Sequence, residues 1–410
     1  MSAPAGRAAP ESPESFRVLA LLSLAELFGM SLWFSASAVA PLLKAEWSLS
    51  DAFATWLTLA VQLGFVAGTL ASATLNLPDV WAPRQLVIGA SLAGAAANAS
   101  LALFSRGPAS ALALRFLTGF CLAGVYPPGM KILASWFRAR RGLALGVLIG
   151  ALTLGKGVPY LVNAVFGAAW RRSLFAASGL TLLGALLVAF FIREGPLAPA
   201  PARFDVMQIA KVFANRGVRL ASFGYFGHMW ELYAMWTWVP VMLRSGFALH
   251  GLPPAAAEAA SFLVIGCGAA GCVLAGLAAD RKGRTLVTSV AMSVSGTCCA
   301  VIGLCYGASP LVLLAVAAVW GATVVADSAQ FSAAVTELGD PVYMGTALTL
   351  QTSLGFLLTT LSIDLVPAFL PALGWRWVFA LLAPGPALGV LAMLRLRALP
   401  EAAKIAQGRR

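Results

Sequence analysis

Long apolar segments, separated by short polar stretches, follow one another from Arg17 to Leu394. A helix needs about 20 apolar residues to cross a bilayer core of about 30 Å. Segments of that length lie at about 17–43, 53–76, 84–105, 109–135, 142–167, 173–193, 218–243, 259–279, 285–307, 310–335, 343–369 and 376–395. The pattern therefore predicts an all-α membrane protein with twelve transmembrane helices.

The second six of these segments repeat the first six. Pro108, ahead of the fourth segment, recurs as Pro310 ahead of the tenth. Gly119 recurs as Gly321, again at an offset of 202 residues. Internal duplication of a polytopic membrane protein is typical of transporters in which one half rocks against the other. The repeat therefore predicts two pseudo-symmetric bundles of six helices each.

The longest polar connection, at 194–216, contains three prolines and lies between the two repeats. We expect it to be a cytoplasmic linker between an N-terminal bundle at 17–193 and a C-terminal bundle at 217–395. The segments 1–16 and 396–410 are expected to be cytoplasmic tails. Because no soluble domain is inserted between the predicted spans, uphill transport would have to draw on an ion gradient.

Composition and charge also indicate a membrane protein. Hydrophobic residues make up 60% of the chain and charged residues 11%, which leaves too little polar surface for a large soluble protein. With the N-terminus inside, 19 Lys and Arg residues fall on cytoplasmic segments and six on external ones. The net charge of +12 therefore marks topology by the positive-inside rule and does not indicate a nucleic-acid partner. We expect a multi-pass protein of the cytoplasmic (inner) membrane with both termini in the cytoplasm.

The six cysteines all lie within predicted spans. Neither they nor the two histidines show metal-ligand spacing, and buried small apolar side chains are the simpler interpretation. We expect no metal ion and no other cofactor.

A polar loop after the eighth span, from Gly276 to Arg284, reads Gly-Leu-Ala-Ala-Asp-Arg-Lys-Gly-Arg. It resembles the G-x-x-x-D-R-x-G-R loop of the major facilitator superfamily, which lies between spans 2 and 3 and again between spans 8 and 9. An acid at a helix end can pair with a basic residue or cap a neighbouring helix. The resemblance implies a conformational gate made of Gly276, Asp280, Arg281, Gly283 and Arg284.

Other elements of the family pattern are partly present. The first-half copy of the loop, from Asn76 to Arg84, keeps only the acid Asp79 and one basic residue. Arg115 with Gly119 resembles the R-x-x-x-G element of span 4, which the family associates with proton coupling. In span 5 the run from Gly155 to Pro159 lacks the pattern of the family's drug antiporters, which disfavours that function.

Ionisable residues interrupt several predicted spans. Each costs about 2.5–3.5 kcal/mol near a span centre, so such residues usually face a cavity or a partner. They are Glu26 in span 1, Arg115 in span 4, Lys156 in span 5, His228 and Glu231 in span 7, and Asp327 in span 10. By resemblance to the superfamily, spans 1, 4, 7 and 10 line the central cavity.

Helical spacing extends these positions into polar and aromatic faces. The residues that we expect to bind substrate are Arg115, Lys156, Trp33, Tyr126, Tyr160, Trp238 and Gln330. The candidates for proton coupling are Glu231 and Asp327, followed by Glu26 and His228. A structural alternative stands beside each assignment: Arg115 could be an ion-pair partner that fixes Glu26, and His228 a hydrogen-bonded helix contact.

These features favour a secondary active transporter that moves a small organic anion by alternating access with proton coupling. A proton-driven exporter of amphiphilic cations is the main alternative, and a transporter-like sensor or channel is an alternative of another class. No constellation of nucleophile and base indicates an enzyme. The expected partners are a small-molecule substrate, protons or another coupling ion, and the lipid bilayer, around a monomeric protein.

The predicted topology can be tested by labelling single cysteines in a cysteine-free background. Cysteines at Arg140 and Arg281 should react with a membrane-impermeant maleimide only from the cytoplasmic side, because the positive-inside rule places both there. A cysteine at Arg106, in a predicted external loop, is the control and should react from outside. External labelling at Arg140 or Arg281 would overturn the orientation.

Overall fold

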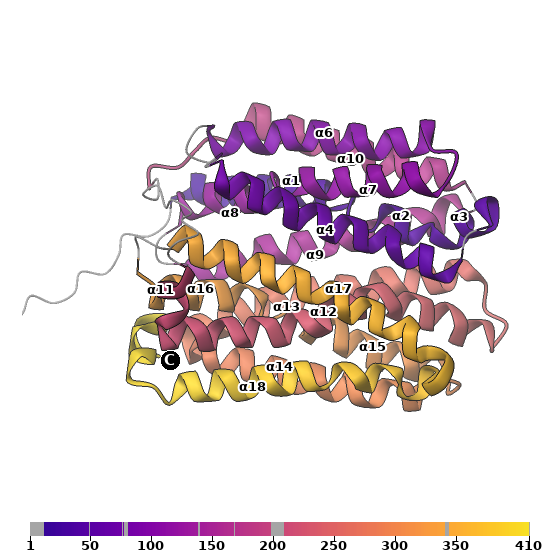
Figure 1. Cartoon of the computed structure of the whole chain (residues 1–410). Coiled ribbons are helices and arrows are strands. Elements are labelled where there is room, and N and C mark those ends of the chain that lie inside the picture. Colours follow the sequence, from indigo (N-terminus) through magenta and orange to yellow (C-terminus); the bar gives the residue numbers. More distant parts are fainter. Residues whose placement is uncertain are drawn as a thin grey trace, which may run out of the picture.

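The structure is a computed structural model that describes residues 12–48, 50–75, 77, 81–137, 140–167, 169–197, 209–340 and 344–409. All regular secondary structure in these residues is helical, as the sequence predicts. The helices run side by side along one common direction, with the N-terminal half in one layer and the C-terminal half in the other (Figure 1). The prolines of the linker at 199 and 201 and the acid at 79 lie outside the described residues.

In the N-terminal half, residues 12–197, several helices begin at a serine or a proline. Ser12 accepts a hydrogen bond from the Ser15 backbone N–H, and Ser50 accepts one from Phe53, as N-caps do. The helices of this half are α1 (Pro13–Met30), α2 (Ser35–Ala38), α3 (Ala40–Trp47), α4 (Asp51–Thr74), α6 (Pro83–Phe104), α7 (Pro108–Leu122), α8 (Tyr126–Ala134), α9 (Arg141–Phe166) and α10 (Trp170–Phe191).

The C-terminal half, residues 209–409, begins with a short helix, and Asn215 then caps the long helix that follows by accepting from the Val218 N–H. Its helices are α11 (Ile209–Ala214), α12 (Arg216–Ala248), α13 (Pro254–Lys282), α14 (Arg284–Val301), η2 (Ile302–Cys305), α15 (Pro310–Val324), α16 (Ser328–Leu338), α17 (Met344–Trp377), η4 (Val378–Leu382), α18 (Pro384–Arg397) and η5 (Pro400–Gly408).

The predicted spans 1, 4 and 10 are each interrupted by a short break in the α-helix, a detail that the sequence pattern does not predict. Span 1 breaks at residues 31–34, span 4 at 123–125 and span 10 at 325–327. The last two breaks are related by the 202-residue offset of the sequence repeat. Broken helices in membrane proteins are tolerated where the freed backbone groups are buried in protein, and they often mark binding sites.

Nine helical stretches of the described residues are long and apolar enough to cross a membrane. The stretch Met344–Arg397 covers predicted spans 11 and 12, and the remaining predicted spans, 1 and 7, correspond to α1–α3 and α12. Both run parallel to the other helices in Figure 1. Span 7 carries many polar and aromatic side chains, several of them buried, and span 1 is divided among three shorter helices.

Glycines set the closest approaches between helices, and they do so equivalently in the two halves. A methyl group added at Gly119 of α7 would lie 2.1 Å from the backbone oxygen of Val61 in α4. One added at the repeat-related Gly321 of α15 would lie 2.0 Å from the backbone oxygen of Val264 in α13. Any larger side chain would therefore push these helices apart.

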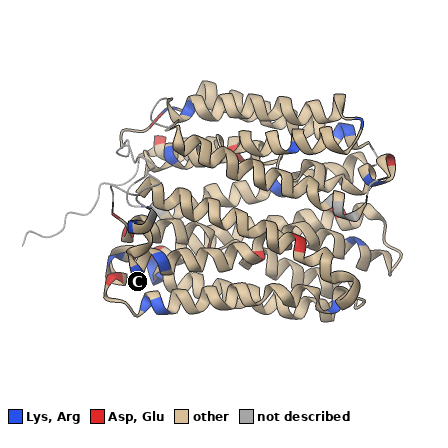
Figure 2. Ribbon diagram, in the orientation of Figure 1, with Lys and Arg blue, Asp and Glu red and all other residues tan. Residues whose placement is uncertain are grey.

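Glycines also set the closest approach between the two halves. In α9, a methyl group at Gly146 would lie 2.7 Å from the backbone oxygen of Cys272 in α13, and one at Gly150 would lie 2.9 Å from that of Ala269. At the end of the bundle where α13 turns into α14, basic side chains gather around the C-terminus (Figure 2). The α9–α13 pair therefore joins the halves near this basic end.

Candidate functional site

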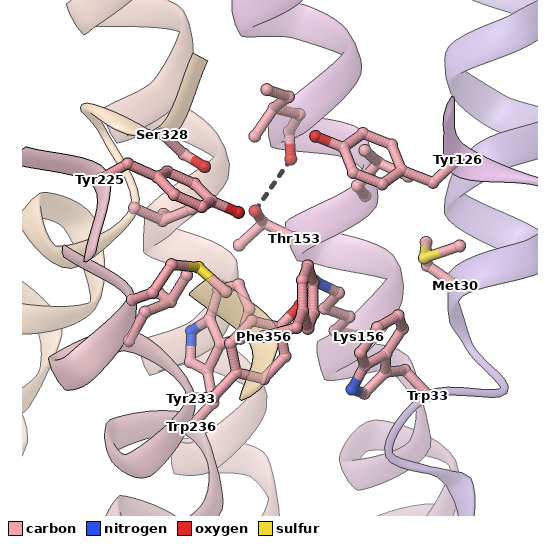
Figure 3. Close-up of a pocket in the computed structure, with 15 residues that line it drawn as sticks. Met30, Trp33, Tyr126, Thr153, Lys156, Tyr225, Tyr233, Trp236, Ser328 and Phe356 are labelled. Atoms are coloured by element: carbon pink, nitrogen blue, oxygen red, sulfur yellow. Dashed lines mark hydrogen bonds between the residues drawn. The ribbon is translucent and has the colours of Figure 1, made fainter. Parts of the chain in front are cut away.

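A cavity lies where the two halves meet, and side chains from both halves line it (Figure 3). Six of its fifteen lining side chains are aromatic: Trp33, Tyr126, Tyr225, Tyr233, Trp236 and Phe356. Its volume of about 40 Å³ holds only a few water molecules, because each needs roughly 10–15 Å³. A solute larger than that requires the halves to move apart.

The ammonium group of Lys156 lies among three of these aromatic rings. Its Nζ is 4.7 Å from the ring centroid of Trp33, 4.8 Å from that of Tyr233 and 4.6 Å from that of Trp236. It donates a hydrogen bond of 2.6 Å to the Tyr233 hydroxyl. A desolvated cation gains about 2 kcal/mol or more from an aromatic face. Among the described residues that line the cavity Lys156 is the one charged side chain, and no acid balances it there.

The position of Lys156 follows from the glycines on either side of it. A methyl group at Gly155 would lie 2.2 Å from the backbone oxygen of Leu27 in α1. One at Gly157 would lie 3.3 Å from the ring of Phe262 in α13. Helix α9 therefore presses against a helix of each half, and the lysine emerges between the halves.

Trp33 reaches the cavity from the break in span 1, and Arg115 of α7 stabilises that break. The guanidinium Nη1 donates to the backbone oxygen of Leu32 over 3.0 Å, and Nη2 donates to the backbone oxygen of Trp33 itself. Nε donates to Leu57 in α4 over 3.3 Å. Arg115 is fully buried, and it does not line the cavity. Its hydrogen bonds therefore tie α7 to the break in span 1 and to α4, and it supplies a donor to the Trp33 backbone oxygen within the break.

Glu26 is also buried, and its carboxylate lies against Gly129 of α8. In the described part of the chain neither of its oxygens has a hydrogen-bond partner. The possible ion pair with Arg115 is not formed, because the guanidinium is engaged by backbone oxygens of α4 and of the span 1 break.

In the C-terminal half, two polar contacts join α12 to the broken span 10. Nδ1 of His228 lies 2.8 Å from Oδ1 of Asp327, and both side chains are only 1% exposed. Glu231 accepts hydrogen bonds from Trp320 Nε1 over 2.5 Å and from the Ser295 hydroxyl over 2.9 Å. The carboxylates thus lie between packed helices and do not line the cavity.

The cavity face of α12 differs from the face that the sequence indicates. Ionisable residues pointed to the face with His228 and Glu231, but the cavity is lined by the adjacent face, which includes Tyr225, Tyr233 and Trp236. These three residues follow helical spacing of eight and three residues. The spacing is visible in the sequence, but nothing in it distinguishes a cavity face from a packed one.

The loop between α13 and α14 touches the N-terminal half through Asp280. Its carboxylate lies against Gly142 at the start of α9 and accepts a hydrogen bond from the Leu143 backbone N–H. This places a negative charge at the positive end of α9, a favourable interaction with the helix dipole. Gly276 packs on the backbone of Gly142 in the same contact, and the side chain of Arg281 is exposed.

Gly283 and Arg284 of the same loop organise the C-terminal half. Gly283 has a φ of 95°, a conformation that favours glycine, and it separates α13 from α14. Arg284 donates two hydrogen bonds to Glu337, and Nη1 donates to Gln330 Oε1 over 2.7 Å. Glu337 also accepts from the backbone N–H of Ala406 in η5. Gln330 therefore belongs to this network and not to the cavity lining.

A second contact between the halves lies at the far end of α9 and α13. Glu258 of α13 pairs with Arg244 of α12 over 2.7 Å, and the Asn163 side chain of α9 lies against the same carboxylate. Tyr160, one turn from Lys156, lies close to this pair. Helices α9 and α13 therefore touch on both sides of the cavity.

The other substrate-binding candidates divide between cavity and packing. Trp33, Tyr126 and Lys156 line the cavity, whereas Arg115, Tyr160, Trp238 and Gln330 do not. The indole N–H of Trp238 donates to the backbone oxygen of Ile363 in α17, which makes it a packing contact. No group of three metal-ligating side chains occurs among the described residues.

A duplicated helical bundle with a cavity between its halves, and contacts between the halves on both sides of that cavity, is typical of membrane transport proteins. The family model described as Major Facilitator Superfamily matches residues 21–363. The chain therefore belongs to the Major Facilitator Superfamily, whose members are transporters and not enzymes.

Several transporters are similar to the chain. A gallate transporter of Pseudomonas putida is 25% identical over 68% of this chain and 69% of its own length. A probable sulfoacetate transporter of Cupriavidus necator is 27% identical over 60% of each chain. A 4-hydroxybenzoate transporter of Pseudomonas aeruginosa is 25% identical over 59% of this chain and 62% of its own. The match thus spans less than two thirds of the latter two relatives.

The structural role of Arg115 can be tested by its removal. Arg115→Ala should lower the melting temperature of the purified protein clearly, because the buried backbone oxygen of Trp33 would lose its donor, which costs about 1–3 kcal/mol. Arg106→Ala, which removes an exposed arginine, is the control and should leave it unchanged. A wild-type melting temperature for Arg115→Ala, with loss of ligand binding alone, would instead indicate a direct substrate contact.

Proposed function

We propose that this protein is a secondary active transporter that moves a small organic anion across the membrane by alternating access. The observation that carries the proposal is Lys156, a buried cation that faces the cavity between the halves without an acidic neighbour in its lining. Burying an ammonium group costs several kcal/mol even after relaxation. An anionic solute would supply the counter-charge that the described lining residues do not provide.

The named solutes of the relatives support a negatively charged substrate. Gallate, sulfoacetate and 4-hydroxybenzoate each carry a carboxylate group. Two of them are aromatic and one is a small aliphatic sulfonate, so the names agree on charge and not on shape. The anion assignment for this chain therefore rests on the agreement between that charge and Lys156.

The alternative, export of amphiphilic cations, would require acidic groups in the cavity. Glu231 and Asp327 are the acids that suggested it, but both are engaged between packed helices. A cation entering the cavity would meet the charge of Lys156 first. The arrangement of charges therefore favours an anion.

Alternating access would use the two contacts between α9 and α13. Release of Asp280 from the start of α9 would open the basic end of the bundle, and release of Glu258 from Asn163 would open the other end. The bundles at 17–193 and 217–395 would then rock as units about the linker at 194–216. Each opening enlarges a cavity that holds only a few water molecules in this structure.

Anion binding can be tested by removing the charge of Lys156. Lys156→Ala should weaken binding of benzoate by at least about 100-fold, because a charge-assisted hydrogen bond contributes roughly 1.5–3 kcal/mol and the ionic attraction adds to it. Expression and melting temperature should stay near those of the wild type, since removal of a buried charge also removes its desolvation cost. Isothermal titration calorimetry on the detergent-purified protein measures the change.

Lys404→Ala is the matched control, because it removes an exposed lysine of η5 that is far along the chain from the cavity residues. It should bind benzoate as the wild type does. Normal benzoate affinity in Lys156→Ala would remove the main support for an anionic substrate.

Proton coupling is assigned to the buried contacts between α12 and the broken span 10. Asp327 pairs with His228, and Glu231 accepts from Trp320, so a proton gained or lost on either carboxylate changes a contact between these two elements. Both elements also supply cavity residues, Tyr233 from α12 and Ser328 from α16. Protonation and substrate binding would therefore act on the same pair of helices.

Neutralising these carboxylates should separate coupled from uncoupled transport. In proteoliposomes, Glu231→Gln or Asp327→Asn should stop pH-driven accumulation of the substrate yet spare exchange of substrate for substrate, because exchange needs no net proton movement. Glu401→Gln, at an exposed glutamate, is the control. Normal acid-driven accumulation in both variants and in Glu26→Gln would show that these carboxylates do not couple transport to protons. His228 would then be the next candidate.

A further inference from the structure

We propose that the cavity selects a hydroxylated aromatic monocarboxylate, whose carboxylate binds Lys156 and the indole N–H groups of Trp33 and Trp236. This inference rests on the proposed function, which requires only an organic anion, and it adds the shape and the orientation of that anion. Three separate features of the cavity carry it.

The first feature is a pair of unused hydrogen-bond donors beside the lysine. The indole nitrogens of Trp33 and Trp236 are buried, and neither has a hydrogen-bond partner in the described part of the chain. Both side chains are only 1% exposed. A buried donor left without a partner costs free energy comparable to a lost hydrogen bond, so these two N–H groups are suited to an acceptor that arrives with the substrate.

The two indoles also come from different halves of the protein. Trp33 belongs to the break in span 1 and Trp236 to α12, and Lys156 Nζ lies 4.7 and 4.6 Å from their ring centroids. The ammonium group therefore has an indole from each half as a direct neighbour, and each indole carries an unused N–H donor. Binding would draw the halves together around the anion, as alternating access requires.

The second feature is the set of aromatic faces around this point. The ring centroids of Trp33 and Phe356 are 5.6 Å apart, and that of Tyr233 is 5.5 Å from Trp33 and 5.1 Å from Phe356. When the halves move apart, Trp33 separates from Tyr233 and Phe356, which leaves a slot lined by aromatic rings. A planar ring fills such a slot with stacking contacts that an aliphatic chain of equal size cannot make.

The third feature is a group of hydroxyls away from the lysine. In Figure 3 the hydroxyl groups of Tyr126, Thr153 and Tyr225 point toward one another on the side of the cavity away from Trp33 and Trp236. The Thr153 hydroxyl donates to the backbone oxygen of Ile149 over 2.8 Å, so toward a ligand it acts as an acceptor. A substrate anchored by its carboxylate at Lys156 would present its far end to these groups, and a ring hydroxyl would match them.

The ligand series that tests the shape holds the charge constant. We expect 4-hydroxybenzoate to bind the wild-type protein about tenfold more tightly than benzoate, and benzoate about tenfold more tightly than cyclohexanecarboxylate. One hydrogen bond or one good aromatic contact accounts for a factor of that order. 4-Hydroxybenzamide, which lacks the charge, should not bind measurably. Isothermal titration calorimetry on the full-length purified protein gives the dissociation constants.

The variants that test the orientation remove an N–H group and keep an aromatic ring. Trp33→Phe and Trp236→Phe should each weaken 4-hydroxybenzoate binding about tenfold, because each removes one donor to a charged acceptor. Trp136→Phe is the matched control, since its indole N–H donates to the backbone oxygen of Arg193 and not to the cavity. It should bind as the wild type does.

The outcomes separate this inference from the proposed function. Equal affinity for benzoate and cyclohexanecarboxylate, abolished in both cases by Lys156→Ala, would overturn aromatic selection and leave an anion transporter. Unchanged affinity in both tryptophan variants would overturn the indole contacts. Absence of binding by every carboxylate, or binding that Lys156→Ala leaves unchanged for all of them, would overturn the proposed function itself.

Discussion

The positive charge of Lys156, buried between the two halves, is the constraint on which the account of the site depends. An ammonium group in a low-dielectric bundle is unfavourable unless something replaces its hydration. Three aromatic faces and one tyrosine hydroxyl do so here. Such contacts hold a cation in place without neutralising it, so the cavity keeps a positive potential. A carboxylate in the same place would have satisfied the lysine and left no attraction for an anionic solute.

Close helix packing makes this arrangement possible. Glycines at 155 and 157 bring α9 against a helix of each half, so the side chain between them faces both halves. The aromatic partner Trp33 depends in turn on the break in span 1, which Arg115 stabilises through backbone oxygens. A residue deep in the N-terminal half therefore acts on the site through the backbone that presents Trp33.

Much of this could be predicted from the sequence, because the signals are local. Apolar segments of membrane-spanning length, the 202-residue repeat and the loop around Asp280 each show in a short stretch of residues. Lys156 stood out for the same reason, as a lysine well inside an apolar span. The breaks in the helices did not stand out in the sequence. In span 1, for example, residues 31–34 are as apolar as the helix around them. The contacts of Arg115 with Leu32 and Trp33 were missed as a consequence, since both backbone oxygens lie where the helix is interrupted.

Which face of α12 points toward the cavity also could not be predicted from the sequence. Ionisable residues drew attention to the face with His228 and Glu231, yet a buried acid can be satisfied between helices as well as in a cavity. Which of two adjacent faces meets the other half depends on packing across the whole bundle. Tyr233 and Trp236 therefore became candidates only when the two halves were placed together.

The central claim is that an organic anion binds at Lys156. The most direct measurement is a crystal structure of the protein with 3-iodo-4-hydroxybenzoate, in which anomalous scattering from iodine fixes the orientation of the ring. We predict that the carboxylate lies within hydrogen-bond distance of Lys156 Nζ and that the iodine lies on the side of Tyr126 and Tyr225. An iodine signal outside the cavity, or a carboxylate bound to another basic residue, would contradict it.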